Sequence, residues 1–288
     1  MNKKQKWFLL KFLTPPHSKE YLQYICWQNN CIGLEEKTDS DTNLITLAYF
    51  NCVSDLQKSK AEIERYANRN EFDFIFETKK ITDEKWKESW HKFFKPHQIG
   101  SKFAIHPPWD YPHFIDRHAI EINPGQAFGT GLHESTILCI ELMEDTELKN
   151  KVCLDMGCGS GILSIVASHL GAKAIISVDN DKIAVDETRD NAERNHLKQI
   201  IFPVVGTPNC LGINKCEYMI ANLEVHIFRE FREAIANAMK NKGILIVSGF
   251  LVEYKCEIMN FFSKYNFKSM KELCKNQWTG CLLIKNDN

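Results

Sequence analysis

The sequence lacks the patterns that would mark a metal-binding or repetitive protein. None of its eleven cysteines forms a Cys-x-x-Cys pair, and the spacings of Cys26 to Cys31 and of Cys153 to Cys158 are too wide for the usual zinc knuckle. It contains no internal repeat and no low-complexity tract. We therefore expect no metal site, and we interpret the cysteines as reduced thiols of a cytosolic protein.

An excess of charge and a long apolar run are also absent. Lys and Arg total 36 against 37 Asp and Glu, so the chain has no general basic character with which to hold phosphate backbones. No stretch approaches the ~18–20 apolar residues of a membrane span. The apolar run near the N-terminus is broken by Lys11 and has no small-residue cleavage site after it, unlike a signal peptide. We expect a cytoplasmic monomer that recognises neither nucleic acid nor membrane directly.

The first eighty residues alternate between segments with the two-residue period of strands and segments with the period of helices. Apolar residues recur at helical spacing in two stretches, and Ser18 stands where it could cap the first of these helices. The resulting order is βαββαβ, which is typical of a ferredoxin-like domain. The expected strands are residues 7–12, 31–37, 44–50 and 72–78, and the expected helices are residues 18–29 and 54–68.

Residues 81–114 are expected to link this domain, residues 1–80, to a second one at 115–288. The segment contains Trp86 and Trp90, four positions apart and so on one helical face, and prolines interrupt its end. We favour a linker helix that packs its tryptophans on a domain, and the alternative is an aromatic surface that binds substrate.

From residue 151 short apolar runs alternate with helical stretches. The runs at 152–156, 174–179, 200–205, 218–221 and 244–248 are separated by helical patterns at 162–170, 183–195, 227–239 and 252–265. This alternation predicts an α/β fold with a largely parallel sheet and helices on both faces. Ligands bind such sheets beyond the carboxyl ends of the strands.

The first of these strands runs into a glycine loop, Asp155-Met156-Gly157-Cys158-Gly159-Ser160-Gly161. A dinucleotide fingerprint needs Gly-x-Gly-x-x-Gly, and here Ile162 occupies the last glycine's place. A phosphate-binding P-loop needs Gly-Lys-Ser/Thr, which is absent. The acidic residue followed by Gly-x-Gly-x-Gly resembles the first motif of S-adenosylmethionine-dependent methyltransferases. Asp155 could help to hold the ammonium of that cofactor, directly or through water.

Asp179 ends the next strand, where a carboxylate can accept hydrogen bonds from both ribose hydroxyls of a nucleoside. Asp181 is interpreted as the N-cap of the helix that follows. The loop and Asp179 together predict a Rossmann-like class I methyltransferase domain that binds S-adenosyl-L-methionine.

Residues 125–136, which read GQAFGTGLHEST, resemble one family in particular, ribosomal protein methyltransferase A (PrmA). Residues 86–109 resemble the linker of this family, and residues 179–195 and Ala221-Asn222-Leu223 also resemble it, so that the similarity covers about residues 84–285. The first eighty residues match it mainly in predicted topology. This chain has Ser135-Thr136 where the family commonly has two threonines, and Glu134 where proline is frequent.

The resemblance implies methylation of the eleventh protein of the large ribosomal subunit. It implies cofactor contacts at Thr136, Gly157, Asp179 and Asn222, and it makes the N-terminal domain the module that recognises the substrate. His133 could act as a base, although local hydrogen bonding is the favoured role for it.

Asn222 is the predicted catalytic residue, because its side-chain oxygen or the carbonyl beside it could orient an amine. Methyltransferases that act on glutamine or on base amino groups often carry Asn/Asp-Pro-Pro-aromatic here, whereas this chain has Asn222-Leu223-Glu224-Val225. We therefore expect lysine side-chain or N-terminal amines as substrates. The alternatives are methylation of another protein lysine or small amine, and a non-catalytic ribosome-binding module.

Overall fold

The structure is a computed structural model that describes residues 6–15, 18–40, 43–70, 72, 76–82, 94–112, 114, 116–125, 129, 131–213 and 215–287. The chain divides into two compact units, Met1–Lys95 and Pro96–Asn288. Among the described residues, no helix combines the length and apolar character needed to cross a membrane. All eleven cysteines are described, and each is a free thiol.

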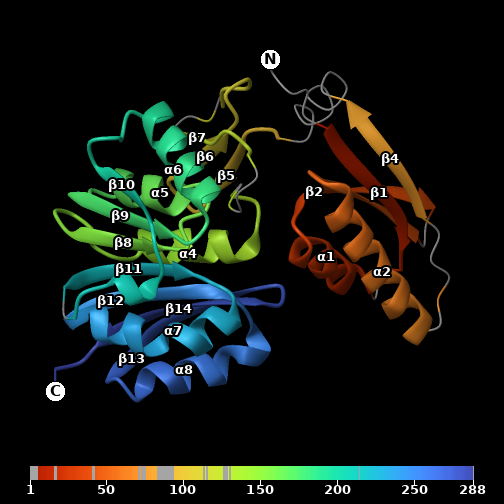
Figure 1. Cartoon of the computed structure of the whole chain (residues 1–288). Coiled ribbons are helices and arrows are strands. Elements are labelled where there is room, and N and C mark those ends of the chain that lie inside the picture. The colour runs from red at the N-terminus through yellow and green to blue at the C-terminus, as the bar shows by residue number, and fades with distance from the viewer. Residues whose placement is uncertain are drawn as a thin grey trace. The chain divides into compact units, whose positions relative to one another are not determined.

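The first unit has the predicted βαββαβ order, which confirms the ferredoxin-like fold (Figure 1). Its four strands pair antiparallel in the order β2-β3-β1-β4. Ser18 precedes the first helix, but its hydroxyl makes no capping hydrogen bond, so the predicted cap is wrong in that respect. The elements are β1 (Lys6–Thr14), α1 (Lys19–Gln28), β2 (Cys31–Ser40), β3 (Asn43–Phe50), α2 (Val53–Arg69) and β4 (Phe76–Thr82).

Alternation along β1 explains how this sheet packs. Leu10 and Phe12 are buried in one apolar cluster with residues of α1 and α2, such as Ile63. Trp7 and Leu9 belong to a separate cluster with residues of β3. Because side chains two apart in a strand share a face, the two sets lie on opposite faces of the sheet. The two-residue alternation of apolar side chains along β1 therefore determines which face of the sheet the helices cover.

The second unit is built on a seven-stranded sheet with the order β10-β9-β8-β11-β12-β14-β13. The five strands from β10 to β12 are parallel, as the sequence predicted, and β14 pairs antiparallel with both β12 and β13. The strands are β8 (Val152–Met156), β9 (Ala174–Asp179), β10 (Ile201–Val205), β11 (Cys216–Asn222), β12 (Met239–Leu251), β13 (Phe267–Lys275) and β14 (Trp278–Lys285).

Helices cover both faces of this sheet (Figure 1). One apolar core joins the sheet to α4 (Glu134–Glu144), α5 (Ile162–His169) and α6 (Lys182–Arg194). A second core joins the other face to α7 (Val225–Ala238) and α8 (Lys255–Ser263). The arrangement is the three-layered, Rossmann-like α/β fold that the alternating pattern predicted.

A small three-stranded sheet precedes α4 and belongs to the second unit. It comprises β5 (His97–Ile99), β6 (Phe103–His106) and β7 (His118–Glu121), and its buried side chains join the same core as α4 and α5. Strands β5 and β6 fall within the segment that the sequence assigned to a linker. Trp86 and Trp90, the basis of the expected linker helix, lie outside the described residues.

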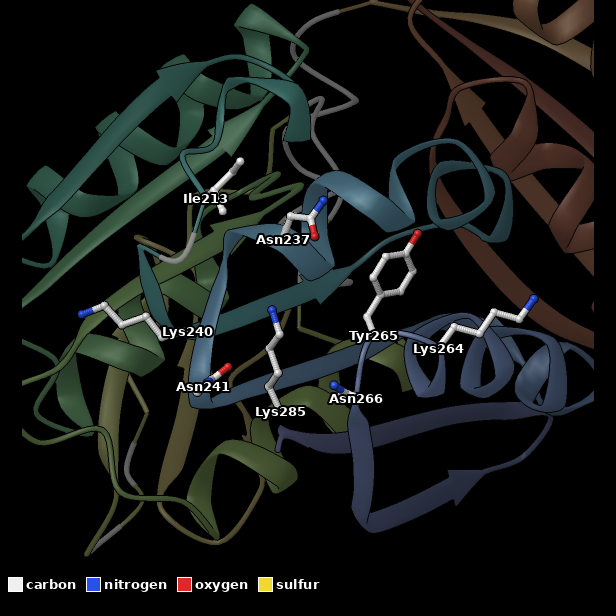
Figure 2. Close-up of a pocket in the computed structure, with 8 residues that line it drawn as sticks. All are labelled: Ile213, Asn237, Lys240, Asn241, Lys264, Tyr265, Asn266 and Lys285. Carbon is white, nitrogen blue, oxygen red and sulfur yellow. The ribbon is translucent and has the colours of Figure 1, made fainter. Parts of the chain in front are cut away.

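A hollow of about 640 Å³ opens at the amino ends of the parallel strands (Figure 2). Lys285 is only 9% exposed there and donates to the carbonyl oxygens of Ala236 and Met239, at 2.9 and 3.0 Å. Burial lowers the pKa of its ammonium group. The side chain thus satisfies carbonyls that the end of α7 leaves without an intrahelical partner. The lining residues are Ile213, Asn237, Lys240, Asn241, Lys264, Tyr265, Asn266 and Lys285.

Replacing Lys285 with methionine tests this structural role. Methionine keeps the apolar stem but leaves the carbonyls of Ala236 and Met239 without their donor, so we expect a loss of roughly 1–3 kcal/mol in the free energy of unfolding. Urea denaturation followed by circular dichroism measures it. Lys264→Met is the matched control, because Lys264 lines the same hollow but is exposed, and should change stability by less than about 0.5 kcal/mol. Equal losses in the two variants would contradict the interpretation.

Candidate functional site

The loop of residues 157–161 joins β8 to α5 at the carboxyl edge of the sheet. Gly157 has a φ of 74°, in the region that favours glycine. A Cβ added there would lie 2.4 Å from Cδ2 of Leu223, the residue that follows β11. Glycine is therefore needed at this position both for its conformation and for the close approach of Leu223.

Hydrogen bonds from the neighbouring elements fix the loop. The N–H of Gly157 donates to the carbonyl oxygen of Val178 in β9, at 2.8 Å. The buried hydroxyl of Thr188 in α6 donates to the carbonyl oxygen of Gly159, at 2.9 Å. The main chain of the loop is therefore held by β9 and by α6. At its glycines, no side chain would stand between the main chain and a ligand.

Asp179 stands at the end of β9, next to the loop. One carboxylate oxygen accepts from the N–H of Gly159 and the other from the N–H of Asp181, each at 3.0 Å. Both oxygens keep further lone pairs, so a ribose diol could donate to the same carboxylate. Asp181 accepts from the N–H of Ile183 at 2.8 Å, which confirms its prediction as the N-cap of α6.

Asp155 lies beneath the loop and is fully buried. Its Oδ2 accepts from the hydroxyl of Ser164 at 2.6 Å, and that hydroxyl is 2.6 Å from the hydroxyl of Ser177. Its Oδ1 has no hydrogen-bond partner among the described residues. Burial raises the pKa of Asp155 to about 6, against the opposing effect of the Ser164 hydrogen bond. A cationic group of a ligand would lower this cost, which fits the ammonium of S-adenosylmethionine.

Thr136 and Asn222 meet across the same edge of the sheet. Thr136 lies in the first turn of α4 and is fully buried, and Asn222 is the last residue of β11. The Nδ2 of Asn222 is 3.4 Å from the hydroxyl oxygen of Thr136. Its Oδ1 is buried without a partner among the described residues. Gly249 leaves room for this oxygen, because a Cβ at position 249 would lie 2.9 Å from it.

His133 has a structural role as the N-cap of α4. Its Nδ1 accepts from the N–H of Ser135 at 3.2 Å and is 2.8 Å from the Ser135 hydroxyl. The imidazole packs edge-on against Trp278, with ring centroids 4.4 Å apart. Burial lowers its pKa, which favours the neutral form at pH 7. Because the Nδ1 lone pair is engaged with Ser135, local hydrogen bonding explains this residue better than base catalysis.

The structure therefore brings all the residues predicted to contact the cofactor to one edge of the sheet. Gly157, Asp179 and Asn222 follow or end the adjacent strands β8, β9 and β11, and Thr136 reaches them from α4. Their contacts with the cofactor stay predictions. Residues 126–128 and 130, part of the stretch that resembles the PrmA family, lie outside the described residues.

The sequence did not identify the polar side chains of α6 that hydrogen-bond to the loop at this edge. Thr188 and Asn191 are both almost fully buried on α6, three positions apart on one helical face. Polar residues seldom occupy the buried face of a helix unless they are hydrogen-bonded. That spacing, in the helix after Asp179, is the signal that could have identified them.

Comparisons with known proteins identify the family that this chain matches. The family model described as "Ribosomal protein L11 methyltransferase (PrmA)" matches residues 19–286. A ribosomal protein L11 methyltransferase of Staphylococcus aureus is 33% identical over 257 residues, covering 87% of this chain and 82% of that protein. The protein of the same name from Prochlorococcus marinus is 35% identical over 212 residues, covering 71% and 70%.

One solved structure supports the fold. The ribosomal protein L11 methylase of Lactobacillus delbrueckii subsp. bulgaricus has a TM-score of 0.62 to this chain at 24% identity. The likeness covers 67% of this chain and all of that one.

The buried carboxylate of Asp155 predicts a pH dependence of cofactor binding. With a pKa of about 6 in the free protein, Asp155 is ionised above pH 7 and becomes protonated as the pH falls through 6. Because a ligand ammonium favours the ionised form, the affinity for S-adenosylhomocysteine should be constant above about pH 7 and fall by up to about tenfold per pH unit below 6. Calorimetric titrations from pH 5 to 8 measure this dependence.

Asp155→Asn provides the control, because its side-chain oxygen can still accept from Ser164 but the group does not titrate. Its affinity should be weaker at neutral pH and nearly constant across the range. If the two proteins gave parallel pH profiles, another group would be responsible.

Proposed function

The chain belongs to the ribosomal protein L11 methyltransferase (PrmA) family, and we propose that it transfers methyl groups from S-adenosyl-L-methionine to amines of that ribosomal protein. The acceptors would be lysine side-chain amines, the N-terminal amine, or both. The observation that carries the proposal is the unpartnered Oδ1 of Asn222 at the edge of the sheet that also holds the glycine loop and Asp179.

The residues present fit the cofactor. Its ammonium would find the carboxylate of Asp155 beneath the loop, and its ribose hydroxyls would find Asp179. When bound, S-adenosylmethionine supplies a methyl group on a positively charged sulfur that is a good leaving group. The protein is left with two tasks, which are to position a nucleophile and to favour its neutral form.

An amine suits these tasks better than an amide. A lysine ammonium with a pKa near 10.4 must lose a proton, which costs roughly 4–5 kcal/mol at neutral pH, whereas an α-amino group needs much less. The Oδ1 of Asn222 could accept an N–H of the neutral amine and so leave its lone pair free to point toward the methyl group. The residues after Asn222 are Leu223-Glu224-Val225, which lack the prolines and the aromatic ring that hold a planar amide.

We propose that residues 1–80 recognise the protein substrate, that residues 81–114 link them to the catalytic domain, and that residues 115–288 hold the cofactor and carry out the transfer. Within the linking segment, β5 and β6 pack in the core of the second unit. Support comes from the family match, which begins at residue 19 and so includes most of the ferredoxin-like fold. The proposal also has the protein act as a monomer in the cytoplasm without direct nucleic-acid recognition.

Labelling of ribosomal components tests the substrate. The protein is incubated with labelled S-adenosylmethionine and, in parallel, with the eleventh large-subunit protein, intact large subunits, total ribosomal protein and a small-molecule extract. We expect label on the eleventh protein, and mass spectrometry should place it on lysine or α-amino nitrogen. Label on glutamine or RNA would contradict the amine acceptor. Label confined to another protein or to a metabolite would contradict the substrate, and cofactor affinity without label on any component would favour a binding module.

Asn222→Leu tests the role of the unpartnered oxygen. Loss of the acceptor should lower kcat by roughly 10²-fold at saturating cofactor, because the amine is no longer oriented. Single-turnover rates across a cofactor titration separate this effect from weaker cofactor binding. Thr136→Val is the matched comparison, since it removes only the partner of Nδ2 and should reduce kcat much less. Full recovery of the Asn222→Leu rate at high cofactor concentration would show that Asn222 acts through the cofactor alone.

A further inference from the structure

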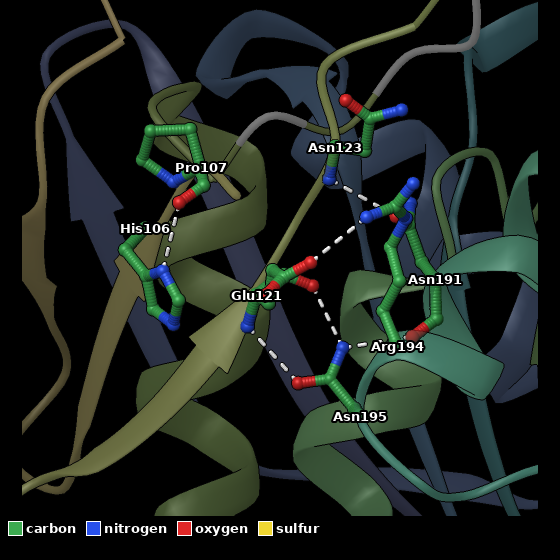
Figure 3. Close-up of polar contacts among 7 residues, drawn as sticks. All are labelled: His106, Pro107, Glu121, Asn123, Asn191, Arg194 and Asn195. Carbon is green, nitrogen blue, oxygen red and sulfur yellow. Dashed lines mark hydrogen bonds and ion pairs between the residues drawn. The ribbon is translucent and has the colours of Figure 1, made fainter. Parts of the chain in front are cut away.

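Asn191 connects two segments that are distant in the sequence. Its Oδ1 accepts from the N–H of Asn123 at 3.0 Å (Figure 3). Its Nδ2 donates to the carbonyl oxygen of Ser160 at 2.9 Å. Asn123 follows β7, and Ser160 lies within the cofactor loop. The side chain of Asn191 is 1% exposed, so water cannot readily replace either bond.

A second contact joins the same two regions. The hydroxyl of Ser160, itself 3% exposed, donates to the carbonyl oxygen of Gly129. The chain then continues through Gly131 to α4, where Thr136 meets Asn222. Ser160 therefore receives Asn191 on its carbonyl group and holds Gly129 with its hydroxyl, which ties the loop to the chain leading to Thr136.

We propose that Asn191 is a positioning residue that sets the cofactor loop in register with the chain before α4, and so sets both ends of the cofactor site relative to each other. It touches neither the cofactor nor the substrate in this assignment. The proposal rests on the cofactor site alone, and so it holds whichever protein is methylated.

The amide group is the chemical requirement at this position. It presents one acceptor to a main-chain N–H and one donor to a main-chain carbonyl at the same time. A carboxylate could still accept from Asn123, but it would face the Ser160 carbonyl oxygen without a proton to donate. An apolar side chain would leave both main-chain groups buried without a partner, which is unfavourable.

Asn195, one turn further along, offers a matched control. Its Oδ1 accepts from the N–H of Glu121 at 3.0 Å, and its Nδ2 donates to the carbonyl oxygen of Glu121 at 2.7 Å (Figure 3). Asn195 thus fixes the end of β7 much as Asn191 fixes Asn123, but it makes no hydrogen bond to the cofactor loop. A comparison of variants at the two asparagines therefore distinguishes a contribution to the fold from a contribution to the cofactor loop.

The test compares Asn191→Leu, Asn191→Asp and Asn195→Leu by thermal unfolding and by calorimetric titration with S-adenosylhomocysteine. Both variants at position 191 should bind this ligand at least about tenfold more weakly, and at saturating S-adenosylmethionine their kcat should also fall. Asn195→Leu should lower the melting temperature by a similar amount but keep the affinity within about twofold. Asn191→Asp keeps the bond to Asn123, so it still gives a reading if Asn191→Leu does not fold.

Combining Asn191→Asp with Ser160→Ala tests whether the two contacts act together. If both hold the same register, the affinity loss of the double variant should be smaller than the sum of the single losses in free energy. Strict additivity would overturn the shared role. Unchanged ligand affinity in the variants at position 191, with a loss of melting temperature alone, would overturn the proposal and leave Asn191 a structural residue of the fold.

Discussion

The site depends on one constraint, which is that the main chain at residues 157–161 must be rigid although three of its five residues are glycines. Small side chains let a ligand come close, but they also remove the packing that would hold the loop in place. In this structure, the loop is restrained by hydrogen bonds from neighbouring elements. Main-chain bonds from β9 and side-chain bonds from Thr188 and Asn191 hold the loop in place.

The same constraint explains why buried polar groups gather under the loop. Asp155, Ser164 and Ser177 are all fully buried and linked in series, although burying a carboxylate is costly. That cost raises the pKa of Asp155 to about 6 in the protein without its cofactor. Binding of a cation would then offset part of this cost, and in this way the buried carboxylate would contribute to the affinity for the cofactor.

Sequence patterns predicted the parts of this fold that are local and periodic. The parallel strands, their helices and the ferredoxin-like order follow from alternation and from turns between short apolar runs. The antiparallel pair β13 and β14 was not predicted, because its pattern is mixed, with β13 largely exposed and β14 largely buried. The small sheet was missed as well, since β5 and β6 are three and four residues long and lie among prolines.

For the site, the sequence identified the residues predicted to contact the cofactor and missed the side chains of α6 that hydrogen-bond to the loop. Asp155, Gly157 and Asp179 occur at strand ends, where position alone indicates function. The role of Asn191 depends on contacts with Asn123 and Ser160, which lie 68 and 31 positions away in the chain. Such long-range contacts have no local signal beyond a polar residue at a position whose helical spacing assigns it to the core.

The residues predicted to bind the cofactor give no information on the choice of substrate. The glycine loop, Asp155 and Asp179 are predicted to bind the cofactor and not the substrate. They are therefore compatible with many different methyl acceptors. Choice of substrate would then depend on other groups, such as those near Asn222 or in the first unit. Residue-level agreement with the family was visible in the sequence only from about residue 84, whereas the family match begins at residue 19. The family match thus includes most of the first unit, which we propose recognises the protein substrate, and this favours a ribosomal protein over a small amine as the acceptor.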